Sequence, residues 1–124
     1  MRFLLWFGAA FYFFEAIIHG LGLAILEHDK IFLPTHDRYI AIFALTYAAL
    51  LILIATDIKK YRHLFILTMV GILVSAINAA VIAQNGWYFE LFQTTALDQN
   101  LSFIGVGAII WYLTTLGLWW RSRS

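Results

Sequence analysis

The sequence predicts an all-α integral membrane protein whose four transmembrane helices form an up-and-down bundle. The 124-residue chain is 63% hydrophobic and 12% charged, with a mean hydropathy of +0.84, whereas soluble domains are about half apolar and about a quarter charged. Its apolar residues gather into four long runs, and its basic residues fall mainly on one side of them. This composition excludes a soluble enzyme, and a net charge of +1 does not suit a nucleic-acid binder.

Each apolar run can cross a hydrocarbon core, which requires roughly 20 residues of helix. The first run is the longest and leads into a polar connection with two His-Asp pairs. The second is the shortest and ends at a basic connection, which the third follows. The fourth closes with a pair of tryptophans, as is typical of a membrane boundary. The expected spans are residues 3–26, 39–56, 64–83 and 101–120 of a single domain, 1–124.

The basic residues predict the orientation, because cytoplasmic loops of membrane proteins are enriched in lysine and arginine. Only Lys30 and Arg38 lie on the predicted outer side. We therefore expect both termini and the central connection to be cytoplasmic, in a bacterial or archaeal plasma membrane. The remaining basic residues share that side: Arg2, Lys59, Lys60, Arg62, Arg121 and Arg123.

The connection at residues 84–100 predicts a short interfacial helix between the third and fourth spans. Asn85-Gly86 favours a turn. The bulky side chains that follow recur at helical spacing, as in helices that lie in the membrane interface. These side chains are Trp87, Tyr88, Leu91 and Phe92.

Two ionisable side chains inside the first span form the centre of a candidate intramembrane site. Burying one in lipid costs at least about 2.5–3.5 kcal/mol, so each needs a reason. Glu15 lies near the middle of the predicted span, and His19 lies one turn later on the same face. Polar residues of the other spans lie at similar depth and complete the candidate site: Tyr47, Asn78 and Tyr112.

The Glu15–His19 pair has two interpretations. In the structural one, the pair is a polar contact that specifies how the helices pack. In the functional one, Glu15 binds and releases a proton or a cation, and His19 acts as a relay.

The histidines also raise two cofactor hypotheses. A haem held by this chain alone is not expected, because only His19 is inside the membrane and His63 lies at the opposite edge. The outer connection supplies ligands suited to zinc, copper or iron, namely His28, Asp29, His36 and Asp37. The alternative for this segment is that Pro34 and Thr35 start a helix and Asp37 complements its N-terminal dipole.

In size, number of helices and a single glutamate within the first span, the chain resembles the small multidrug resistance transporters. That resemblance implies a dimer in which Glu15 exchanges protons for cationic substrates. It is one of architecture, which does not establish function. His19 departs from that family's pattern, and the third span has no aromatic residue beyond Phe65.

Three functions are compatible with the sequence, of which the first is the one that the sequence favours and the other two are its alternatives. The first is a non-catalytic accessory or assembly subunit of a larger membrane complex, because the chain is nearly all span and has no catalytic set. The second is a proton-coupled transporter of a small molecule or cation, which acts as a homodimer through Glu15. The third is a small membrane enzyme or metal-handling protein, which uses Glu15 and His19 or the outer His/Asp connection.

Overall fold

The computed structural model describes residues 1–23, 34–84 and 96–123, without the side chains of residues 82–84 and 96–103, and this part of the chain is all-helical. Three segments are long and apolar enough to cross a membrane: Arg2–Leu21, Pro34–Thr56 and Arg62–Val81. The expected all-α fold is therefore confirmed for the described residues, and these three helices fit a helical membrane protein. The helices are α1 (Arg2–Leu21), α2 (Pro34–Thr56), α3 (Arg62–Gln84) and α5 (Ala96–Arg121). The expected interfacial helix falls mainly on residues 85–95, outside the described part.

The connection between α1 and α2 differs from the prediction at both ends. The predicted first span continues to residue 26, but α1 ends at Leu21 because Gly22 adopts a left-handed conformation with φ 66°, which glycine tolerates best. The N–H of Leu23 then donates to the Ile18 carbonyl at 2.9 Å. The predicted second span begins at residue 39, but α2 already starts at Pro34, whose fixed φ and missing N–H suit a first helical position.

The earlier end of α1 changes the depth of Glu15. This residue lies six positions before the last residue of α1, which is about 9 Å along a helix axis. Glu15 is therefore in the final third of α1, and not at its middle as the longer predicted span required.

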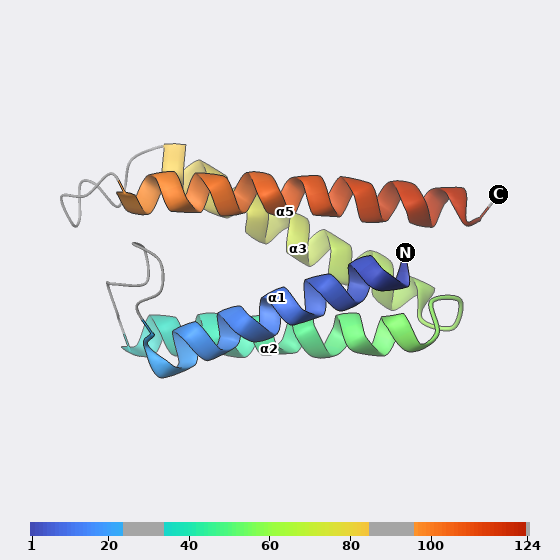
Figure 1. Ribbon diagram of the computed structural model, residues 1–124, viewed down its shortest axis with the longest axis horizontal. Coiled ribbons are helices and arrows are strands. Elements are labelled where there is room, and N and C mark those ends of the chain that lie inside the picture. Colours follow the sequence, from blue (N-terminus) through green and yellow to red (C-terminus); the bar gives the residue numbers. More distant parts are fainter. Residues whose placement is uncertain (24–33, 85–95, 124) are drawn as a thin grey trace.

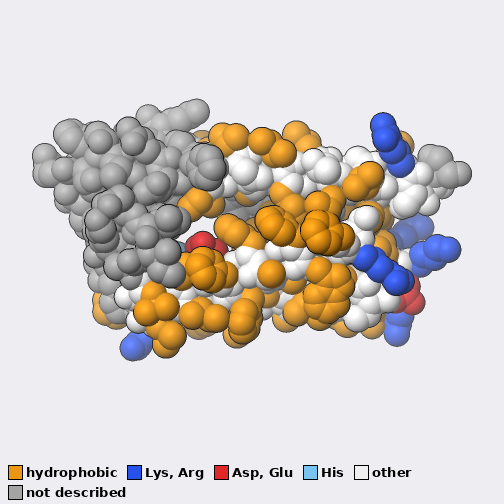
Figure 2. All heavy atoms as spheres, in the orientation of Figure 1, with side chains coloured by type: hydrophobic (Ala, Val, Ile, Leu, Met, Phe, Trp, Pro, Cys, Tyr) orange, Lys and Arg blue, Asp and Glu red, His pale blue; other side chains and the backbone are white. Residues whose placement is uncertain are grey.

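The helices pack mainly as two antiparallel pairs, α1 with α2 and α3 with α5. Figure 1 shows α1 and α2 side by side, α5 on the opposite side of the molecule, and α3 running obliquely from the end of α2 towards α5. The two termini lie at the same end of the molecule (Figure 1). That end also carries most of the lysine and arginine side chains visible in Figure 2.

An apolar core joins the two pairs near the end that carries the termini. Leu5, Leu51, Ile54 and Phe65 are completely buried there. The rings of Phe65 and Trp119 pack with centroids 5.2 Å apart. This cluster buries side chains from all four helices and holds α1–α2 against α3–α5.

Glycines permit the closest approaches between helices. A Cβ atom on Gly8 would lie 2.5 Å from Cζ2 of Trp111, and the indole of Trp111 donates a hydrogen bond to the Leu4 carbonyl at 2.9 Å. A Cβ on Gly71 would lie 2.7 Å from the hydroxyl oxygen of Tyr47. These small residues therefore serve packing within the chain, as is common where helices approach closely in membranes.

Candidate functional site

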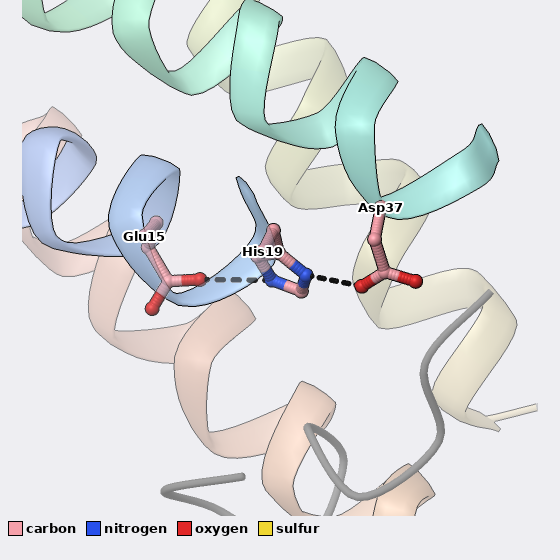
Figure 3. Close-up of polar contacts among 3 residues, drawn as sticks. All are labelled: Glu15, His19 and Asp37. Carbon is pink, nitrogen blue, oxygen red and sulfur yellow. Dashed lines mark hydrogen bonds and ion pairs between the residues drawn. The ribbon is translucent and has the colours of Figure 1, made fainter. Parts of the chain in front are cut away.

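The candidate site is a histidine held between two carboxyl groups at the contact of α1 with α2 (Figure 3). Nδ1 of His19 is hydrogen-bonded to Oδ1 of Asp37 at 2.7 Å. Nε2 of His19 lies 3.3 Å from Oε2 of Glu15, one helical turn earlier on α1. We call these three residues the acid–histidine cluster.

The turn between α1 and α2 positions the cluster. His19 lies in the last turn of α1, and Asp37 lies in the first turn of α2. The antiparallel packing of the two helices therefore brings these side chains together. The helices are close here, because a Cβ on Gly20 would lie 3.5 Å from that of Ala41. Asp37 thus lies where its charge complements the N-terminal dipole of α2, as expected, and also contacts His19.

The cluster is largely shielded from solvent. The side chains of Glu15, His19 and Asp37 are 15%, 11% and 10% exposed. In Figure 2 an acidic side chain is visible in a hollow between the helix layers, at the border of the undescribed residues. Charges are costly at such a position unless they are compensated. An imidazolium between two carboxylates compensates one of them and leaves one net negative charge in the cluster.

The geometry requires a proton that the cluster shares. Carboxylates only accept hydrogen bonds, and a neutral imidazole has a single N–H. To bridge both acids, His19 must therefore be an imidazolium, or one acid must be protonated. These two states contain the same number of protons and differ only in where one of them resides. A short move between nitrogen and oxygen interconverts them, which makes the cluster chemically suited to accept, hold and pass on a proton.

Two tyrosines extend this polar face towards the middle of the bundle. Tyr12 lies three residues before Glu15 on α1, so the two side chains are neighbours on the helix surface. The rings of Tyr12 and Tyr47 pack with centroids 5.4 Å apart. Tyr47 was expected at this site, and Tyr12 was not.

The other two residues of the expected intramembrane site lie elsewhere. Asn78 is on the exposed side of α3. Tyr112 is buried in the apolar core cluster with Leu5, Phe65 and Met69. These two residues were grouped with Glu15 only because they were expected at a similar depth in the membrane. Their side chains lie on helix faces that do not meet Glu15.

The expected outer metal site is only partly within the described residues. His28 and Asp29 lie outside them. His36 is exposed, and Asp37 is buried against His19, so these two neighbours have different environments. Among the described residues, no group of three or more His, Asp or Glu side chains is arranged to hold a metal ion.

One further polar residue was not singled out from the sequence. Thr68 of α3 is 3% exposed, and its hydroxyl has no hydrogen-bond partner among the described residues. An unsatisfied buried hydroxyl costs about 1–3 kcal/mol. In contrast, the equally buried Thr115 donates to the Trp111 carbonyl at 2.7 Å. Only the packed structure distinguishes these two threonines.

No protein-family model, curated protein or solved structure matches this chain. The functional interpretation therefore rests on the geometry of the acid–histidine cluster.

Proposed function

We propose that this chain is a four-span membrane protein that exchanges protons at Glu15, His19 and Asp37, and that it couples this exchange to transport of a small molecule or cation as a homodimer. The observation that carries the proposal is the imidazole of His19 between the buried carboxyl group of Asp37 at 2.7 Å and the largely shielded carboxyl group of Glu15 at 3.3 Å. The second acid adds a position to which the shared proton can move.

In this proposal α5 is the fourth span, and both termini face the cytoplasm of a bacterial or archaeal cell. Support comes from the termini, which lie at one end of the molecule (Figure 1), and from the lysines and arginines near that end (Figure 2). The acid–histidine cluster then lies in the outer third of the membrane, where protons arrive from outside.

The test is transport by the purified chain in liposomes with an imposed pH gradient. An entrapped pH-sensitive dye reports proton movement, and candidate small cations are screened as the coupled substrate. We expect Glu15→Gln to abolish coupled proton movement, because the amide cannot release a proton. Asp57→Asn is the matched control, because Asp57 is an exposed acid in the turn between α2 and α3, where it accepts a hydrogen bond from the Lys60 N–H. Coupled movement that survives Glu15→Gln would overturn the role of this carboxyl.

A second candidate function is an accessory or assembly subunit of a larger membrane complex. The observation that favours it is an aromatic face on α1, where Phe3, Phe7 and Phe14 recur at helical spacing with exposures of 77%, 57% and 49%. Another membrane protein can cover such a face, as lipid can. Mild-detergent extraction with a tag after Ser124 distinguishes the two functions, since a stoichiometric partner would favour the subunit and a homodimer the transporter.

A further inference from the structure

Thr68 differs from five other Ser and Thr side chains of the described helices, of which Thr115 is buried like Thr68. Other hydroxyl side chains satisfy themselves on their own helix by donating to a carbonyl three or four residues earlier. These are Thr46, Thr56, Ser75, Thr114 and Thr115, with donor–acceptor distances of 2.6–2.9 Å. Thr68 is 3% exposed and has no partner within the described residues, so its hydroxyl is available to a molecule between the helices.

The nearest polar feature on α3 is one turn away. The hydroxyl of Tyr47 lies over Gly71, where a Cβ would come within 2.7 Å of it. Thr68 and Gly71 are three residues apart and share a helix face. Side chains at this spacing have Cβ atoms about 5–6 Å apart, a separation that one water molecule can bridge, and buried water typically bonds to otherwise unsatisfied polar groups.

Contacts between side chains connect the region of Thr68 and Tyr47 with the acid–histidine cluster. The Tyr47 ring packs on Tyr12, with centroids 5.4 Å apart. Tyr12 lies three residues before Glu15 on α1, and side chains at this spacing are neighbours on a helix surface. Tyr47, Tyr12 and Glu15 therefore form a series of neighbouring polar side chains from the contact with α3 to the first acid of the cluster.

The register of the helices shows where this series ends. The Phe65–Trp119 ring contact aligns α3 with α5, so that Thr68, one turn further along, lies level with Thr115. Towards the end that carries the termini, the completely buried Leu5, Ile54 and Phe65 follow. Among the buried polar residues of the described part, Thr68 and Thr115 thus lie next to this apolar layer, which we call the apolar barrier.

We infer that Thr68 and Tyr47 bind buried water between α2 and α3, and that this water and Tyr12 form the inner half of the proton route to Glu15. The role as a route rests on the proposed proton exchange, whereas the water site does not. Protons that enter the cluster at Asp37 would reach the middle of the bundle along this series. The apolar barrier would have to open for release on the other side.

The experiment is water-edited solid-state NMR of the full chain in lipid bilayers, which detects magnetisation passing from water to carbon atoms close to it. We expect transfer to Thr68 and to the Tyr47 ring in the wild-type protein. Thr68→Val should abolish the transfer to Tyr47, and Thr68→Ser should retain it because the hydroxyl remains. Thr114→Val is the matched control, since Thr114 is exposed and its hydroxyl bonds to the Ile110 carbonyl.

Absence of transfer to Thr68 and Tyr47 in the wild type, or unchanged transfer to Tyr47 in Thr68→Val, would overturn the water site. The rate of proton movement in liposomes that contain the same variants tests whether the bound water conducts protons. We expect Thr68→Val and Tyr47→Phe to slow proton movement several-fold, while Thr68→Ser and Thr114→Val keep the wild-type rate. Wild-type rates in Thr68→Val would overturn the route. Liposomes with no coupled movement, combined with water transfer to Thr68, would support the water site and contradict the proposed function.

Discussion

The two ends of the α1–α2 pair are built from different chemistry. At the end with the termini, Leu5 and Leu51 are completely buried in an apolar core shared with α3 and α5. At the other end, the same two helices bury Glu15, His19 and Asp37 against one another. The apolar end depends on shape and volume, because its contacts have no direction. The polar end depends on the balance of charge and protons, so one removed group leaves the others uncompensated. The difference indicates that the apolar end holds the fold together, whereas the polar end has a cost that function can explain.

The largest effect is expected from His19→Ala at the polar end. This change leaves two buried acids facing each other without the imidazole between them, and breaking a buried pair in this way costs about 3–5 kcal/mol. The free energy of unfolding in mixed micelles measures it. His63→Ala is the control, because His63 is exposed near the start of α3. Equal stability of the two variants would show that the acid–histidine cluster is not a buried charged unit.

Leu51→Ala tests the apolar end by creating a cavity. Leu51 is completely buried, and such truncations cost about 2–5 kcal/mol, depending on how far the surroundings collapse. The same micelle titration applies, and Leu45→Ala, at a residue that is 51% exposed on the same helix, should cost much less. If both changes cost the same, α2 does not bury the face described here.

Gly8→Ala tests the close approach of α1 to α5. The added methyl would lie 2.5 Å from the Trp111 ring, and overpacking of this kind costs about 1–3 kcal/mol. Gly117→Ala is the matched control. Among the described residues, no atom outside the adjoining helix backbone lies within 4 Å of the added Cβ, and alanine favours a helix over glycine by up to about 1 kcal/mol. In thermal unfolding, we expect Gly8→Ala to lower the unfolding temperature and Gly117→Ala to raise it or leave it unchanged. Destabilisation by Gly117→Ala with no destabilisation by Gly8→Ala would contradict the packing.

The smallest effect is expected from Trp111→Phe, which removes the donor to the Leu4 carbonyl while retaining an aromatic ring. The loss of one neutral hydrogen bond costs about 0.5–1.5 kcal/mol. Trp120→Phe, at a residue that is 68% exposed, serves as the comparison in the same unfolding assay. No difference between these variants would indicate that the indole bond does not contribute to holding α1 against α5.

The sequence predicts the helices well and their contacts poorly, for a physical reason. Long apolar runs require helices in a membrane, because backbone groups there must be satisfied within the segment. The positions where helices begin and end depend on single residues. Gly22 ends α1 earlier, and Pro34 starts α2 earlier, than the apolar runs predict. That shift placed Glu15 closer to the polar end than the apolar run alone suggested.

The sequence predicts two of the three residues of the acid–histidine cluster. Glu15 and His19 share a helix face by spacing alone, so their proximity follows from sequence. Asp37 was assigned to a loop, and its contact with His19 depends on the antiparallel register of α1 and α2. The sequence does contain a signal for this contact. His19 and Asp37 lie at similar distances from the connection between α1 and α2, so antiparallel packing of the two helices brings them to the same level. Asn78 shows the limit of depth as a guide, since it lies on the exposed side of α3.

The central claim is that Glu15, His19 and Asp37 share a proton that can be exchanged. Infrared difference spectroscopy of the full chain in lipid, recorded while the pH is changed, tests it most directly, because a protonated carboxyl group has its own C=O stretching band. We predict a band that appears on acidification, that is altered in both Glu15→Gln and Asp37→Asn, and that is unchanged in Asp57→Asn. A spectrum that is the same in the wild type and in both cluster variants would contradict the claim.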